Sequence, residues 1–146
     1  MLNGDLSNVV APRLIVVFEG AIGSLPESKV KDYEKAAKRN DWWRAVSYFE
    51  LNELMLARIL YLNWKSNFNI SLVTWMPEEA AEAIDEMMSE HSIPVRGCFS
   101  SKPSSLARLL PYNPDIACIY DPVPEHILMF GSKGTVLTDA NQIGRF

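Results

Sequence analysis

The stretch "LIVVFEGAIGSLP", residues 14–26, decides which fold the sequence predicts. Its first five residues are apolar and rich in Val and Ile, which is typical of a strand buried on both faces in a parallel sheet. Glu19 ends this run, and a short loop containing Gly20 and Gly23 follows it. Ligands of open α/β sheets collect beyond the carboxyl ends of the strands, so this loop is a candidate site.

Outward from this stretch, apolar runs alternate with segments of helical periodicity. The expected strands are residues 14–18, 70–75, 93–99, 115–120 and 135–139, and the expected helices are residues 28–40, 41–64, 77–91, 101–111 and 124–130. Asp41 is the expected cap of the second helix, and Gly131 closes the last one. The alternation predicts a three-layer, Rossmann-like α/β fold, with a mostly parallel five-stranded sheet and helices on both faces.

The predicted domain organisation is simple. Residues 1–12 are expected to be a loosely held leader, and residues 13–146 a single domain. The excursion between the first two strands, residues 27–68, is longer than one crossover requires. We therefore expect a helical insertion there, which either caps the rim of the sheet or packs along it.

Composition excludes several classes of partner. The 146 residues are 48% hydrophobic and 22% charged, which is ordinary for a soluble globular protein. The net charge of −4 gives no electrostatic footprint for nucleic acid, and no apolar run approaches the roughly 20 residues that span a bilayer. Cys98 and Cys118 lie at no metal-binding spacing and are expected to be free thiols in a reducing cytoplasm.

Polar side chains stand where the predicted strands end. Glu19 follows the first strand, Thr74 ends the second, Lys102 lies in the loop after the third, and Asp121 follows the fourth. The carboxyl ends of parallel strands meet at one edge of a sheet, so we expect these side chains to converge. A lysine and a hydroxyl suit phosphate oxygens, and two acids suit a divalent cation.

Four motifs in this order resemble those of the haloacid dehalogenase superfamily over roughly residues 13–139. They are "VVFEGAIGSL", the strand "ISLVTW" ending near Thr74, the pair Lys102-Pro103, and "IACIYDPVPEHILMF" with Asp121. The stretch "YDPVPEHILMFGSKGTVLTDANQIG" is also similar to small bacteriophage proteins of this fold. The resemblance implies Mg²⁺ held by Glu19, the backbone carbonyl of Ala21 and Asp121, with Thr74 and Lys102 on phosphate.

The same resemblance shows what this sequence lacks. Glu19 stands where the family has its nucleophilic Asp, and Ala21 stands where it has its acid-base Asp. A carboxylate longer by one methylene misplaces the attacking oxygen, and an alanine transfers no proton. Tyr120 replaces one acid of the fourth motif, and the first loop holds one residue too many. These departures predict a site that has lost phosphoryl transfer.

Each site residue also has a structural interpretation. Glu19 is also explained as a solvent-facing strand end, Thr74 as a helix cap, Lys102 as a surface lysine, and Asp121 before Pro122 as a turn starter. His91 and His126 are too far apart in the sequence to indicate a metal site.

Aromatic residues crowd into residues 42–68, where three of the four tryptophans lie. One interpretation is a helix packed on the sheet; the alternative is a homo-oligomer or partner interface that includes Trp42, Trp43, Tyr61 and Trp64.

Three functions are consistent with the sequence. We favour a non-catalytic binding or interaction protein on a phosphatase-like scaffold. The first alternative is an Mg²⁺-dependent phosphohydrolase that uses Glu19 and Asp121 in an altered way. The second alternative is an unrelated α/β domain that binds a nucleotide at the same edge of the sheet.

Overall fold

A computed structural model describes residues 11–66 and 68–145 of the chain, so most of the predicted leader lies outside the described residues. Its centre is a five-stranded sheet in the order β5-β4-β1-β6-β7, with every strand pair parallel. The strands are β1 (Arg13–Val17), β4 (Asn69–Thr74), β5 (Cys98–Ser100), β6 (Ile116–Asp121) and β7 (Gly134–Val136). The predicted α/β fold class is therefore confirmed.

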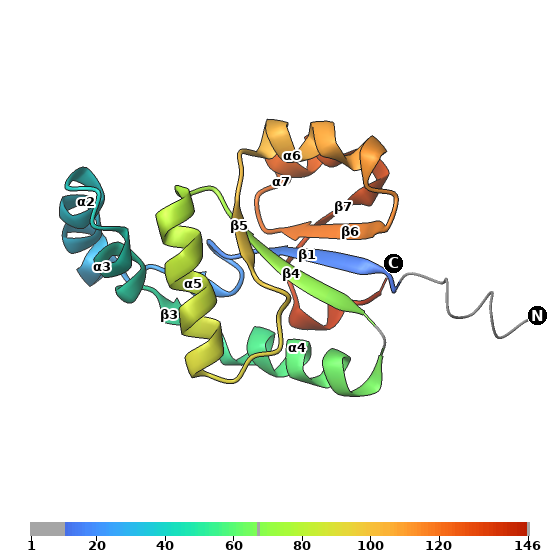
Figure 1. Cartoon of the computed structure of the whole chain (residues 1–146), viewed down its shortest axis with the longest axis horizontal. Helices are drawn as coiled ribbons and strands as arrows, with labels where there is room; N and C mark the ends of the chain where they lie inside the picture. The colour runs from blue at the N-terminus through green and yellow to red at the C-terminus, as the bar shows by residue number, and fades with distance from the viewer. Residues whose placement is uncertain (1–10, 67, 146) are drawn as a thin grey trace, which may run out of the picture.

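Helices cover both faces of this sheet (Figure 1). The helices α4 (Glu53–Lys65) and α5 (Glu78–Glu90) pack on one face, and α6 (Pro103–Leu109) and α7 (Pro124–Phe130) pack on the other. None of the helices among the described residues is both long and apolar enough to cross a membrane.

The central position of β1 in the sheet explains why its residues are apolar without alternation. Leu14 and Val16 belong to the hydrophobic core under α4 and α5, whereas Ile15 and Val17 belong to the core under α6 and α7. All four side chains are fully buried. Successive side chains of a strand point to opposite faces, so a strand covered on both faces must be apolar at every position.

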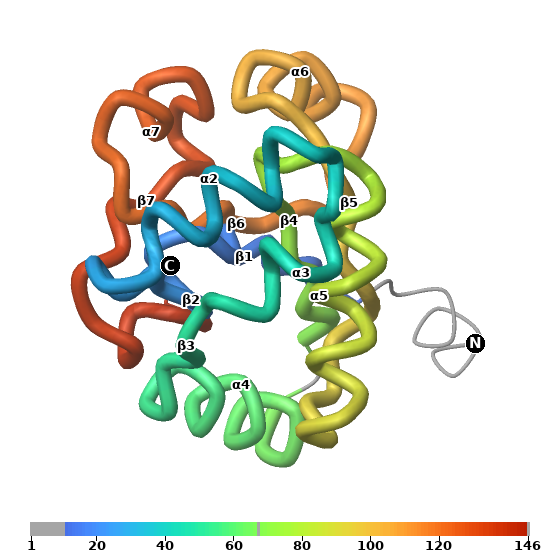
Figure 2. The backbone as a smooth tube through the Cα atoms, turned by 90° about the vertical axis from the view of Figure 1, so that its left-hand side faces the viewer, coloured from blue at the N-terminus to red at the C-terminus, as the bar shows by residue number. Residues whose placement is uncertain are grey.

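The segment between β1 and β4 carries additional elements beyond the carboxyl ends of the strands. A 3₁₀ turn (Glu27–Lys29) leads into α2 (Val30–Lys38) and α3 (Trp42–Ser47). A two-stranded antiparallel sheet joins β2 (Gly23–Ser24) to β3 (Glu50–Leu51). Figure 2, viewed from that end, shows α2 and α3 in front of the main sheet.

The single helix predicted over residues 41–64 is wrong. Asp41 does cap α3, where its side chain accepts from the Arg44 N–H at 3.4 Å. However, α3 ends at Ser47 and α4 begins only after Asn52, whose side chain accepts from the Met55 N–H at 3.1 Å. The intervening backbone pairs with β2 instead of continuing the helix, and the Asn52 N–H donates to the Ile22 carbonyl at 2.8 Å.

Three other boundaries differ from the prediction. The strand expected over residues 93–99 is confined to β5, and Pro94, which has no N–H to donate, lies before it. The strand expected over residues 135–139 is β7, which ends at Val136. The expected tail contains a 3₁₀ turn (Ala140–Gln142) with a capping box made by Asp139 and Gln142.

Candidate functional site

The strand ends predicted to converge lie at one edge of the sheet. β1 pairs in parallel with β4 on one side and with β6 on the other. Val17 is in register with Val73, and Val16 with Tyr120, so Glu19, Thr74 and Asp121 follow neighbouring strands at the same level. The connection order also reverses between β1 and β6, which is where ligands of open α/β sheets bind.

Glu19 points into the protein at this edge. Its Oε2 accepts a hydrogen bond from the backbone N–H of Trp75 at 2.9 Å, whereas its buried Oε1 has no hydrogen-bond partner within the described part of the chain. Burial raises the pKa of the Glu19 carboxyl above its ordinary value of 4.5, and the charge of Asp121 raises it further. Hydrogen bonding by Thr74 and the Trp75 N–H lowers this pKa in part.

Thr74 links Glu19 to the turn after β4. The residue is fully buried, and its Oγ1 accepts from the Met76 N–H at 3.1 Å. Its carbonyl accepts from the Ser101 N–H at 3.1 Å, which holds the β5–α6 loop against the end of β4. Thr74 thus holds the turn before α5 and lies beside Glu19, but it does not cap the helix, because the N-cap of α5 is Pro77 and has no side-chain cap hydrogen bond.

Asp121 is also fully buried, and both of its carboxylate oxygens are occupied. Oδ1 accepts from the Val123 N–H at 2.9 Å, and Oδ2 lies 2.7 Å from Nδ1 of His126. The ring of Trp75 packs edge-on against the His126 ring, with centroids 5.5 Å apart. Two residues that hold the predicted acids, Trp75 and His126, therefore contact each other across the edge of the sheet.

Sequence reasoning missed His126 because it compared the two histidines only with each other. The useful signal was local: His126 follows Asp121 by five residues, across a turn containing Pro122 and Pro124. This turn leads into the first turn of α7 and brings the ring back to the carboxylate.

Lys102 and Ala21 differ from the other predicted site residues. Lys102 is exposed at the N-cap of α6, and in the described part of the chain its ammonium forms no ion pair or hydrogen bond with Glu19, Thr74 or Asp121. Ala21 is buried, with 2% of its surface exposed, and offers only its backbone to a ligand. The structure thus gathers Glu19, Thr74 and Asp121, and adds His126.

These residues fit a divalent cation poorly. Mg²⁺ requires several oxygen ligands in near-octahedral geometry, but Asp121 is fully buried and each of its oxygens already has a contact within the protein. Glu19 retains one unpartnered oxygen, and the resemblance adds only the Ala21 carbonyl. Within the described ranges, no group of three or more His, Cys, Asp or Glu side chains is arranged to hold a metal ion.

An aromatic chain fixes the α2–α3 segment over this edge. Phe18 at the end of β1 contacts Phe49 with ring centroids 5.2 Å apart, and Phe49 contacts Tyr33 of α2 at 5.6 Å. Tyr33 in turn meets Trp42 at 6.5 Å. These ring contacts place the cap beside the site. Burial raises the pKa of Tyr33, and the charge of Glu19 raises it further.

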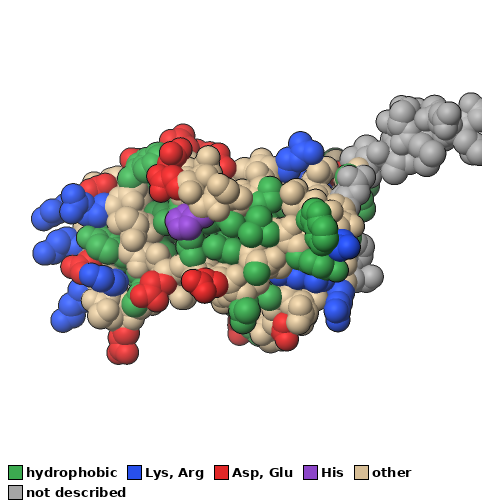
Figure 3. Space-filling model, turned by 90° about the horizontal axis from the view of Figure 1, so that it is seen from below, with side chains coloured by type: hydrophobic (Ala, Val, Ile, Leu, Met, Phe, Trp, Pro, Cys, Tyr) green, Lys and Arg blue, Asp and Glu red, His purple; other side chains and the backbone are tan. Residues whose placement is uncertain are grey.

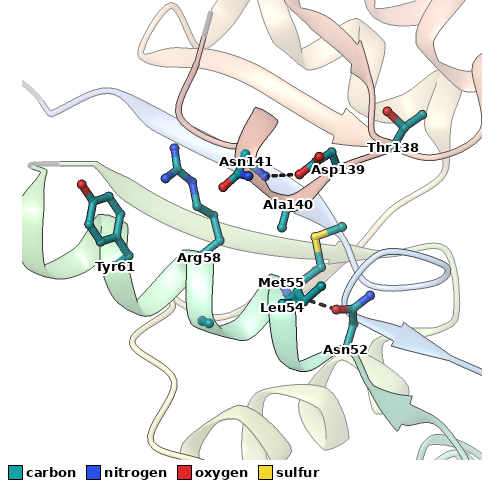
Figure 4. A pocket seen from close by; sticks show the side chains of 10 residues that line it. Asn52, Leu54, Met55, Arg58, Tyr61, Thr138, Asp139, Ala140 and Asn141 are labelled. Atoms are coloured by element: carbon teal, nitrogen blue, oxygen red, sulfur yellow. Dashed lines mark hydrogen bonds between the residues drawn. The ribbon is translucent and has the colours of Figure 1, made fainter.

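A separate groove lies between α4 and the turn at residues 138–141 (Figure 4). Its volume is about 610 Å³, and its lining includes Leu54, Arg58, Tyr61 and Asp139. Arg58 donates from Nε to the Ile143 carbonyl at 2.9 Å, which ties the carboxyl-terminal turn to α4.

Comparisons with known proteins support the fold. No protein-family model matches the sequence, and a search of curated proteins finds no match. A chain in the structure of the Pnkp1/Rnl/Hen1 RNA repair complex is similar, with 9% identity over 87% of this chain and a TM-score of 0.62. The present chain spans only 42% of that chain. Similarity at this identity shows a shared α/β architecture.

Proposed function

We propose that the chain is a non-catalytic binding or interaction protein built on a haloacid dehalogenase-like scaffold. The observation that carries the proposal is the state of Asp121, which is buried with one oxygen on the Val123 N–H and the other beside His126. A fully buried carboxylate with a contact on each oxygen is first of all a structural group, because a cation or substrate would have to displace the Val123 backbone or the His126 ring to reach it.

The first loop supports the same proposal. Ala21 occupies the position of the acid-base residue and supplies no ionisable group. Glu19 occupies the position of the nucleophile, but its pKa is raised by burial and one of its oxygens accepts from the Trp75 N–H. A buried carboxyl that already accepts from a backbone N–H is poorly placed to attack phosphorus, and an alanine protonates no leaving group, so both steps are impaired.

A repair experiment tests this proposal. The double variant Glu19→Asp with Ala21→Asp restores both reactive groups, and release of phosphate from an aryl phosphate with Mg²⁺ is measured for it and for the unmodified chain. We expect no release by the unmodified chain above an Asp121→Asn control. Activity in the double variant would support the family assignment, whereas Mg²⁺-dependent release by the unmodified chain would overturn the proposal.

The alternative function, an Mg²⁺-dependent phosphohydrolase, has one observation in its favour. Glu19 and Asp121 are close enough for the charge of Asp121 to raise the pKa of Glu19, as expected for two acids facing one site. In this alternative, His126 must release Asp121 before a cation binds. A His126→Asn variant that gains phosphatase activity would favour it.

The surface that serves binding is the outer face of α4. Within the predicted interface set, Trp42 packs against Tyr33 of its own chain, whereas Trp43, Tyr61 and Trp64 are exposed. Tyr61 and Trp64 share α4 with exposed Leu54 and Leu60, while Trp43 lies on α3. An exposed apolar face of this kind marks an interaction site.

A further inference from the structure

Four large apolar side chains are exposed on α4, a helix of 13 residues. They are Leu54 (75% exposed), Leu60 (45%), Tyr61 (48%) and Trp64 (75%). Figure 3, which views the molecule from the side of α4 and α5, shows hydrophobic side chains gathered on this surface. Soluble proteins seldom leave several neighbouring large apolar residues in water without a partner for them.

Helical geometry places these residues on one stripe. The inner face of α4 consists of Met55, Leu56, Ile59 and Leu62, all buried in the core. At about 100° per residue, the opposite face is centred on exposed Ala57, with Tyr61 and Trp64 beside it. Because the side chain of Ala57 is small, a second helix can approach the middle of this face closely.

We infer that this face binds the same face of a second copy of the chain, with the two α4 helices antiparallel about a two-fold axis. The inference rests on the proposed function, because it names the partner of an interaction protein. A two-fold interface is self-complementary, so each feature of the helix must meet its counterpart at the same distance from the helix midpoint.

The residues of α4 meet this requirement. Positions equidistant from Ile59 along the helix pair apolar with apolar and acid with base: Leu54 pairs with Trp64, Ala57 with Tyr61, and Glu53 with Lys65. Glu53 and Lys65 are both exposed and lie at opposite ends of the helix. Antiparallel pairing therefore brings opposite charges together at both ends, whereas parallel pairing brings like charges together.

The aromatic side chains are suited to such a contact. Lys65 Nζ lies 4.3 Å from the centroid of the Trp64 ring, and the Arg58 guanidinium lies 5.3 Å from the centroid of Tyr61. Each aromatic ring already carries a cation beside it. The interface then has apolar contacts at its centre and charged groups at its edge, which is the usual anatomy of a protein interface.

Sedimentation velocity of the full chain at increasing concentration tests the inference. We expect a monomer–dimer equilibrium, weakened at least about tenfold by Trp64→Ser or Leu54→Ser and unchanged by the matched control Trp43→Ser on α3. Thermal unfolding of each variant establishes that it is folded. A chain that stays monomeric, or one whose dimer depends on Trp43 instead, would overturn the inference.

Charge reversal tests the antiparallel orientation. Glu53→Lys alone and Lys65→Glu alone should each weaken the dimer, and the double variant should restore it. A double variant no better than the single variants would reject this orientation. If removal of residues 1–10 converts a monomer into a dimer, the face belongs to the leader and the inference is wrong.

These variants leave Glu19, Ala21 and Asp121 unchanged, so failure of the interface is distinguishable from failure of the proposed function. A dimer that releases phosphate would overturn the proposed function and leave the interface standing. A monomer that releases no phosphate would overturn the inference about the interface and leave the proposed function standing.

Discussion

Nδ1 of His126 lies 2.7 Å from Oδ2 of Asp121, and the second oxygen of the same carboxylate accepts from the backbone of Val123. This contact anchors a buried carboxylate that was predicted to bind metal. It also gives His126, which the sequence did not single out, a defined role in the turn between β6 and α7.

Removal of this histidine should destabilise the fold. His126→Ala leaves one oxygen of the fully buried Asp121 without a partner, which costs about 1–3 kcal/mol of unfolding free energy. Urea unfolding at neutral pH measures the effect. The matched control is His91→Ala at the exposed end of α5, and equal effects from the two variants would contradict the assigned contact.

The raised pKa of Glu19 predicts a pH dependence of stability. Between the ordinary pKa of 4.5 and the raised folded-state pKa, the folded chain binds more protons than the unfolded chain. Stability therefore falls as pH rises through this window, and the loss persists at neutral pH.

Glu19→Gln tests this dependence, because the amide stays neutral and its oxygen still accepts from the Trp75 N–H. The variant should have a higher Tm than the unmodified chain at pH 7 and an equal Tm below pH 4.5. Glu27→Gln, at an exposed glutamate, is the control and should not change the profile. A lower Tm for Glu19→Gln at pH 7 would reject the interpretation.

The cap of α4 should contribute measurably to stability. Asn52→Ala removes the side chain that accepts from the Met55 N–H, and loss of such a cap costs about 0.5–2 kcal/mol. Asn63→Ala, at an exposed position inside the same helix, is the matched control. Thermal unfolding should show a lower Tm for Asn52→Ala only.

Cys98 should react slowly with thiol reagents. Burial, followed by the charges of Glu19, Asp85 and Glu78, raises the pKa of the Cys98 thiol well above its ordinary value of 9.0. Because the thiolate is the reactive species, modification of the folded Cys118→Ser variant at pH 8 should be at least about tenfold slower than in urea. Equal rates in the two conditions would contradict the raised pKa.

The sequence was most informative where one local property determines the structure. The apolar residues from Leu14 to Phe18 specify a strand covered on both faces, because no polar position interrupts them. The acids after β1 and β6 were also predictable as neighbours, because parallel strands end at a common edge.

The features that the sequence did not predict depend on contacts between residues that are distant in the sequence. Helical periodicity continues through Tyr48 and Phe49, and only the pairing of β3 with β2 shows that the helix stops there. The contact of Trp75 with His126 likewise joins the loop after β4 to α7, which is remote from it in the sequence. For Lys102 the sequence motif was misleading. Its position in the motif predicted a phosphate-binding residue, whereas the structure places it as the exposed N-cap residue of α6.

The central place of β1 has a consequence for how the chain folds during synthesis. Ile15 is synthesised well before its partner Ile119 on β6, with β4, β5 and the helices α2 to α6 between them. The nascent chain must therefore keep a wholly apolar segment out of wrong associations until β6 has been translated. Fragments that end before β6 should aggregate, and a chaperone that shields the first strand should raise the yield of folded protein.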